Sequence, residues 1–112
     1  MTEYFVWTTT RRIKPGTLQE FERAWRPDPY PEGLRHAYAY WTEDGQEVTG
    51  VSFWDSAELC DQWRATDAEA RRRETMAAYV VAEREAFYRG RPLAVPRPGV
   101  TPNPSVTPRG PA

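Results

Sequence analysis

Residues 33–56 of this chain read GLRHAYAYWTEDGQEVTGVSFWDS, and this stretch decides the fold. Residues 34–42 and 47–54 are rich in aromatic and β-branched side chains, which favour strands. Between them lies Asp44-Gly45, the preferred chemistry of a tight hairpin turn. The stretch therefore predicts two neighbouring antiparallel strands.

The first of these strands carries apolar or aromatic side chains on both faces. Because strand side chains alternate, one face holds Leu34, His36, Tyr38, Tyr40 and Thr42, and the other holds Arg35, Ala37, Ala39 and Trp41. We expect one face to be covered by helices and the other by a ligand or a second subunit. In the second strand, Gly50 indicates either a β-bulge, the commoner cause, or space left for a bulky group.

The flanking segments complete the order strand, helix, strand, strand, helix, strand, which is a βαββαβ chain of the α+β class. A strand is predicted over residues 3–13, and a helix over 17–26 begins with Thr17 and Glu20 as a capping box. Asp55 and Glu58 form a second capping box, for a helix that we expect to continue to about residue 76. Residues 78–95 suit both helix and strand, and we prefer a strand over 84–89. The domain then spans residues 1–95, and residues 96–112 form a proline-rich tail expected to be disordered.

Composition restricts the classes of function. The 112 residues carry a formal net charge of −1, which gives no field to attract nucleic acid or an anionic membrane. Neither a signal peptide nor a membrane-spanning stretch is evident, so we expect a cytoplasmic protein. One His and one Cys make no metal-ligand cluster, and Cys60 suits a buried apolar position.

Several local sequences resemble those of the antibiotic biosynthesis monooxygenase-like proteins. These are Lys14-Pro15-Gly16 before a helix containing Phe21, Gly33-Leu34 opening the second strand, and the step from Phe53 to Glu58 into the second helix. The resemblance covers about residues 3–93. It implies a ferredoxin-like antiparallel sheet with two helices on one face, whose other face pairs with a second subunit to form a dimeric α+β barrel. A ligand cavity is then expected between the sheet and its own helices or loops.

The activity that this resemblance implies is oxygenation of a phenolic or enolic substrate with no cofactor. Such chemistry needs an apolar aromatic pocket, a group that stabilises the substrate anion, and exclusion of water. His36 is the one side chain with an ordinary pKa near neutrality and is the candidate base. Tyr38 and Tyr40 share its face. The alternative is that His36 has a structural role.

Further candidate substrate-binding residues are Trp7, Trp54 and Trp63, with Arg64 as a possible anchor for a carboxylate or phenolate. Each tryptophan could equally belong to the core. Haem-degrading relatives use an Asn on the first strand and an axial His on the second helix. Here the first strand has Thr8 and Thr9 and no His follows Ala57, so haem is not expected.

The first hypothesis is therefore a homodimeric, cofactor-independent monooxygenase of secondary metabolism, acting on a small aromatic or polyketide-like molecule. The second is a cyclase or isomerase on the same scaffold. The third is a non-catalytic ligand-binding or stress-associated dimer in which every aromatic side chain is core.

Overall fold

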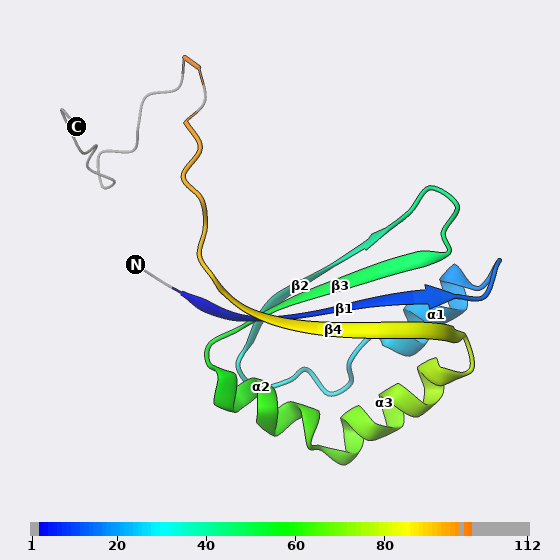
Figure 1. The fold of residues 1–112 in the computed structure, drawn as a ribbon. Coiled ribbons are helices and arrows are strands. Elements are labelled where there is room, and N and C mark those ends of the chain that lie inside the picture. Colours follow the sequence, from blue (N-terminus) through cyan, green and yellow to red (C-terminus); the bar gives the residue numbers. More distant parts are fainter. Residues whose placement is uncertain (1–2, 97, 100–112) are drawn as a thin grey trace.

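The computed structural model describes residues 3–96 and 98–99 and confirms the α+β class (Figure 1). The order of elements is β1 (Tyr4–Ile13), α1 (Leu18–Trp25), β2 (Leu34–Trp41), β3 (Glu47–Trp54), α2 (Ala57–Arg64), α3 (Asp67–Ala77) and β4 (Val80–Gly90). The helices lie on one side of a single sheet, and its opposite side has no helix over it (Figure 1). This is the ferredoxin-like arrangement expected from the sequence, with one additional helix. No helix in the described part of the chain is long and apolar enough to cross a membrane.

The sheet has the strand order β2-β3-β1-β4, and every neighbouring pair is antiparallel. The predicted hairpin joins β2 to β3, and Gly45 takes the positive φ of 70° that its turn requires. β4 is longer than the predicted strand over residues 84–89, because it pairs with β1 along nearly its whole length. The two central strands are therefore β3 and β1.

The core lies between the sheet and the helices, in two clusters of buried side chains. The first contains Trp7, Trp54, Cys60 and Trp63, and the second contains Ile13, Phe21, Val48 and Met76. Alternation along the strands places the members from β1 and β3 on the helix side. Cys60 is fully buried, which agrees with its expected apolar position.

The prediction of a single helix after β3 was wrong. The chain breaks between α2 and α3 at Ala65 and Thr66, and the Thr66 hydroxyl accepts a hydrogen bond of 3.1 Å from the backbone N–H of Glu69. This is an N-cap, so Thr66 starts a new helix. Helical periodicity continued across the break and concealed it in the sequence.

The predicted caps of the other helices also need correction. Ser56, not Asp55, caps α2, since its hydroxyl accepts from the backbone N–H of Leu59 at 3.2 Å. Thr17 makes no side-chain cap on α1; its hydroxyl instead donates to the carbonyl of Lys14 at 2.6 Å. Both errors are local choices between neighbouring polar side chains. They leave the helix positions almost unchanged.

The expectation that both faces of β2 are covered is not met within one chain, since Trp41 on the helix side is 54% exposed. A register shift between Leu34 and His36 turns Leu34 toward the helices, where it packs on the first core cluster, and leaves His36 on the other face. Tyr38 and Tyr40 are 51% and 57% exposed in the single chain. The helix-free face of β2 is thus uncovered within one chain. The predicted tail over residues 96–112 lies almost wholly outside the described residues.

Candidate functional site

A cavity of about 80 Å³ lies between the sheet and the helices and has four indole rings in its wall. The rings come from separate elements: Trp7 from β1, Trp25 from the last position of α1, Trp54 from the last position of β3, and Trp63 from α2. The other lining residues are Thr9, Pro27, Pro31, Leu34, Ala37, Gly50, Val51, Ser52 and Arg72. The wall is therefore mostly apolar, with four flat indole rings and a few polar groups.

Trp25 reaches the cavity because Gly50 leaves room for its ring. A Cβ atom built on Gly50 would lie 2.9 Å from Cζ2 of Trp25 and 3.2 Å from Oγ1 of Thr9. β3 pairs without interruption through Gly50, opposite Thr9 on one side and Ala39 on the other. Of the two predicted roles of Gly50, the structure therefore shows space for a bulky group and no β-bulge. The ring of Trp25 occupies that space.

Hydrogen bonds fix two of the indoles. Nε1 of Trp54 donates to the Ser52 hydroxyl at 2.8 Å, and that hydroxyl donates to the backbone carbonyl of Trp7 at 3.1 Å. Nε1 of Trp7 donates to Oε2 of Glu85 at 2.8 Å. Because both N–H groups already have partners, these rings offer their carbon surfaces to the cavity.

Glu85 lies under Trp7 at the outer edge of this region, among cations. Desolvation raises its pKa, but hydrogen bonds from Arg73 and Trp7 and the charges of Arg73 and Arg64 outweigh that effect, so the pKa of Glu85 falls below its ordinary value. The carboxylate stays ionised near neutral pH. It holds the Trp7 ring in place.

Arg72 is the cationic member of the cavity wall. Its Nε and Nη2 donate to the two carboxylate oxygens of Glu69 at 2.7 and 3.0 Å, and Nη1 donates to the backbone carbonyl of Trp25. Glu69 is fully buried and also accepts from Nε of Arg73 at 3.0 Å. This bidentate geometry sets the direction of the Arg72 guanidinium and ties α3 to the end of α1.

Thr9 supplies a hydroxyl to the cavity. Its Oγ1 accepts a hydrogen bond of 2.9 Å from Nη1 of Arg11, which lies two residues further along β1 and is 2% exposed. Nε of Arg11 donates to Glu83 at 2.8 Å. Burial lowers the pKa of Arg11, although Glu83 opposes that change. The described lining residues include no carboxylate, histidine or tyrosine, so the cavity's ionisable group is Arg72.

The structure divides the predicted site residues between the two faces of the sheet. Trp7, Trp54 and Trp63 line the cavity as predicted. Arg64 does not line it: its guanidinium lies over the rings of Trp7 and Phe87, at 5.3 and 4.9 Å from their centroids, and pairs with Glu85. Arg64 therefore covers the outer side of Trp7.

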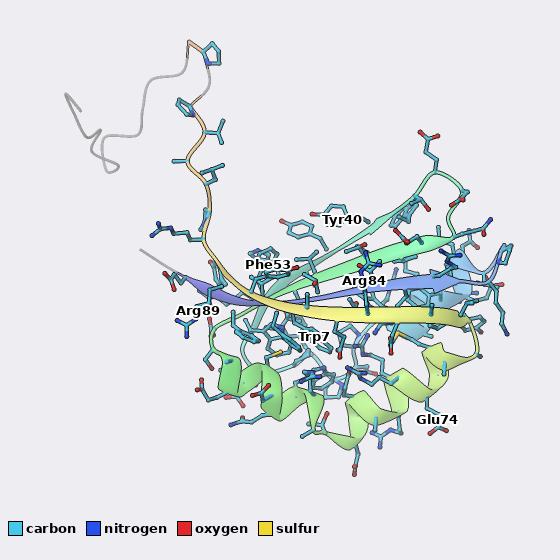
Figure 2. The ribbon with its side chains drawn as sticks, in the orientation of Figure 1. Trp7, Tyr40, Phe53, Glu74, Arg84 and Arg89 are labelled. Atoms are coloured by element: carbon cyan, nitrogen blue, oxygen red, sulfur yellow. The ribbon has the colours of Figure 1, made fainter. Side chains whose placement is uncertain are left out.

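His36, Tyr38 and Tyr40 lie on the helix-free face, away from the cavity. The His36 ring centroid is 6.0 Å from Tyr4, 5.6 Å from Tyr38 and 4.7 Å from Phe53. Figure 2 shows Tyr40 and Phe53 on one side of the sheet and Trp7 on the other. The prediction that placed His36 in one pocket with the tryptophans was wrong, because the sheet separates them. A catalytic role for His36 would need a site on the helix-free face.

Most of the other lining residues were not predicted, among them Trp25, Thr9 and Arg72. Trp25 belonged to the apolar stripe of the first helix, and Gly50 was the signal that a large group approaches this part of β3. For Arg72 there was no local signal, because three arginines follow one another at residues 71–73. Among the described residues, no group of three or more His, Cys, Asp or Glu side chains could hold a metal ion.

Comparison with known proteins supports the assignment of the fold. No family model matches the sequence, and no curated protein matches it. Among solved structures, the monooxygenase ActVA-Orf6 of Streptomyces coelicolor, in complex with nanaomycin D, is 18% identical with a TM-score of 0.72, over 84% of this chain and 93% of that one. A candidate antibiotic biosynthesis monooxygenase from Chloroflexus aurantiacus is 12% identical with a TM-score of 0.67, over 86% of this chain and 99% of that one. The chain thus has the α+β fold of the antibiotic biosynthesis monooxygenases, as the sequence resemblance implied.

Proposed function

We propose that this protein binds a planar aromatic or polyketide-like molecule in the tryptophan-walled cavity and oxygenates it with no cofactor. The observation that carries this proposal is the convergence of four indoles from four elements on one cavity between sheet and helices. Flat aromatic walls stack on aromatic ligands and exclude water. Support also comes from ActVA-Orf6, which shares the fold and whose structure holds nanaomycin D.

The reaction would use the substrate's own electrons. A phenolate donates an electron to O₂, the two radicals combine at a ring carbon, and loss of water leaves a quinone. One oxygen atom enters the ring and the other leaves as water, so no external reductant is needed. The protein's part is to hold the ring between indoles, stabilise the anion with Arg72 and Thr9, and keep out bulk water.

Binding of a molecule with several fused rings requires the cavity to open. One water molecule needs about 10–15 Å³ on this scale, so 80 Å³ holds only a few waters. Trp25, Pro27 and Pro31 form the side of the wall that comes from the end of α1 and the loop after it. We expect this side to move outward when a ligand enters, since the β1 and β3 sides belong to central strands.

Tryptophan fluorescence tests the binding step. A hydroxynaphthoquinone should quench the indoles with a saturable dependence on concentration. The variant Trp25→Phe should weaken binding, whereas the matched variant Trp41→Phe, which changes an indole outside the cavity, should not. If both variants bind like the wild type, the ligand does not use this cavity.

Oxygen uptake and product mass test the reaction. Oxygenation of a phenol to a quinone consumes one O₂ per substrate and adds one oxygen atom while two hydrogens are lost. A cyclase or isomerase would consume no O₂ and would change the mass by loss of water or not at all. Saturable binding with no product in any of these assays would favour the non-catalytic alternative.

We also propose that the helix-free face pairs with the same face of a second copy. Its exposed aromatic side chains, including Tyr38, Tyr40 and Tyr88, form a surface that water covers poorly. Pairing there would complete the barrel that the family resemblance implies, and would bury His36. Sedimentation should show a dimer for the wild type and a monomer for Tyr38→Arg. A wild-type monomer at micromolar concentration would refute the pairing.

A further inference from the structure

We propose that the cavity selects aromatic ligands that are already ionised, and that the Thr9 hydroxyl is the donor that recognises their oxyanion, with Arg11 as its positioning residue. This inference rests on the proposed function, because it concerns the same cavity. It names the class of substrate: a phenol or enol acidic enough to lose its proton near neutral pH. A hydroxyquinone is an example.

The hydrogen of the Thr9 hydroxyl has no acceptor among the described residues. Oγ1 of Thr9 is used only as an acceptor, for Nη1 of Arg11. The other threonines of the described chain are engaged differently: Thr8, Thr17, Thr42, Thr66 and Thr75 each donate to a protein oxygen, and Thr10 and Thr49 share one hydrogen bond. Thr9 is also 6% exposed and lines the cavity. Its hydrogen is therefore available to a ligand.

Arg11 strengthens Thr9 as a donor. A guanidinium that donates to a hydroxyl oxygen withdraws electron density from it, and in a poorly solvated environment this increases the polarity of the O–H bond. The Arg11 side chain is 2% exposed, and Nη2 has no hydrogen-bond partner within the described structure. Its positive charge is thus only partly compensated by Glu83, which is itself 40% exposed.

The charged group that reaches the cavity wall favours an anion. Arg11, Arg72 and Arg73 form hydrogen-bonded pairs with Glu69, Glu83 and Glu85, and Arg64 also pairs with Glu85. Arg64 also lies 3.9 Å from Oδ1 of Asp61, so four arginines face four carboxylates and the cluster as a whole is neutral. Of this cluster only Arg72 reaches the cavity wall, and no carboxylate does. An anionic ligand would therefore meet a donor hydroxyl and a cation, with no like charge in contact.

The same wall lacks a side chain that could remove a proton from a neutral phenol. Threonine and serine hydroxyls are too weakly basic, and the Arg72 guanidinium carries hydrogen-bond donors and no acceptor. A ligand that needs deprotonation would gain nothing from this site. A ligand that enters as an anion would gain a hydrogen bond from Thr9 and the attraction of Arg72.

The test compares two flat ligands of similar size by tryptophan quenching at pH 7. 2-Hydroxy-1,4-naphthoquinone is an anion at that pH, and naphthalene has no oxygen. For Thr9→Val we expect about a tenfold loss of affinity for the hydroxynaphthoquinone, because one hydrogen bond to a charged acceptor is lost. The affinity for naphthalene should change little. Thr9→Ser keeps the hydroxyl and should bind both ligands like the wild type.

Thr9→Val also removes the hydrogen-bond acceptor of the buried Arg11 and could therefore destabilise the fold. A double variant controls for this effect. Thr9→Val/Arg11→Met removes both partners and leaves Glu83 at the solvated edge. The affinity for the hydroxynaphthoquinone divided by that for naphthalene should fall in this double variant as it does in Thr9→Val. The affinity for the hydroxynaphthoquinone should also depend less on pH across the range in which this ligand ionises. A structural role for Arg11 would reduce both affinities alike and leave their ratio unchanged.

The outcomes separate this inference from the proposed function. If Thr9→Val loses affinity equally for both ligands, or for neither, Thr9 does not recognise an oxyanion, although the cavity still binds aromatic molecules. If the wild type binds neither ligand, the proposed aromatic site is refuted and the inference falls with it. A wild type that prefers neutral 1-naphthol to the hydroxynaphthoquinone anion would refute selection of ionised ligands.

Discussion

Gly50→Ala should destabilise this protein although alanine normally suits a strand better than glycine does. The new methyl carbon would lie 2.9 Å from Cζ2 of Trp25 and 3.2 Å from Oγ1 of Thr9, where ordinary contacts begin at 3.4 Å. The indole must move by roughly half an ångström to one ångström. Overpacking of this kind costs about 1–3 kcal/mol of unfolding free energy.

Gly90→Ala is the matched control. It also introduces a methyl group into a strand, but that carbon would lie 3.4 Å from Cγ2 of Val6, an ordinary contact. Because a glycine replacement also reduces the entropy of the unfolded chain, we expect Gly90→Ala to be neutral or stabilising by up to about 1 kcal/mol. The two variants should therefore differ by about 1–3 kcal/mol in urea unfolding at one fixed protein concentration.

A double-mutant cycle identifies the cause. Trp25→Leu removes the ring that the new methyl group meets, so Gly50→Ala should cost at least about 1 kcal/mol less in that background. Equal stabilities of Gly50→Ala and Gly90→Ala would show that the Trp25 ring does not lie on Gly50. Additive effects in the cycle would show that the cost of Gly50→Ala has another origin.

Three further predictions concern buried and titrating side chains. Glu69→Gln should lower the free energy of unfolding in urea by about 3 kcal/mol, because it removes a fully buried charged partner of two guanidinium groups. Glu22→Gln, in an exposed ion pair, should lower it by less than about 0.5 kcal/mol. Similar losses of stability in the two variants would refute this prediction. The pKa of Glu85 lies below its ordinary 4.5, so its contribution to stability is complete above that pH and is lost as the pH falls below it. Glu85→Gln should flatten the acid branch of a stability profile between about pH 5 and 3, and an unchanged branch would contradict the assignment. Burial raises the pKa of Cys60 to about 12, so iodoacetamide should label this thiol at pH 8 only in urea; rapid labelling of the native protein would show that it is accessible.

The sequence determined those features that depend on short segments. Alternation of side chains put His36, Tyr38 and Tyr40 on one face of their strand, but it did not show on which side of the sheet Trp7 and Trp54 lie, and the prediction assigned all of them to one site. Asp44-Gly45 specified the hairpin, since its turn needs a residue tolerant of positive φ. The same local rules were less reliable at helix ends, where neighbouring polar residues compete for one capping position.

Tertiary structure decided what the aromatic residues surround. The register shift beside Leu34 and the break at Thr66 depend on packing and hydrogen bonds that no local pattern specifies. The cavity brings together residues from six elements, and Arg72 belongs to it only because the fold places α3 beside the end of α1. Sequence can show that a side chain points to one face of a sheet. Only the folded chain fixes which helix covers that face, and therefore which groups a ligand would meet.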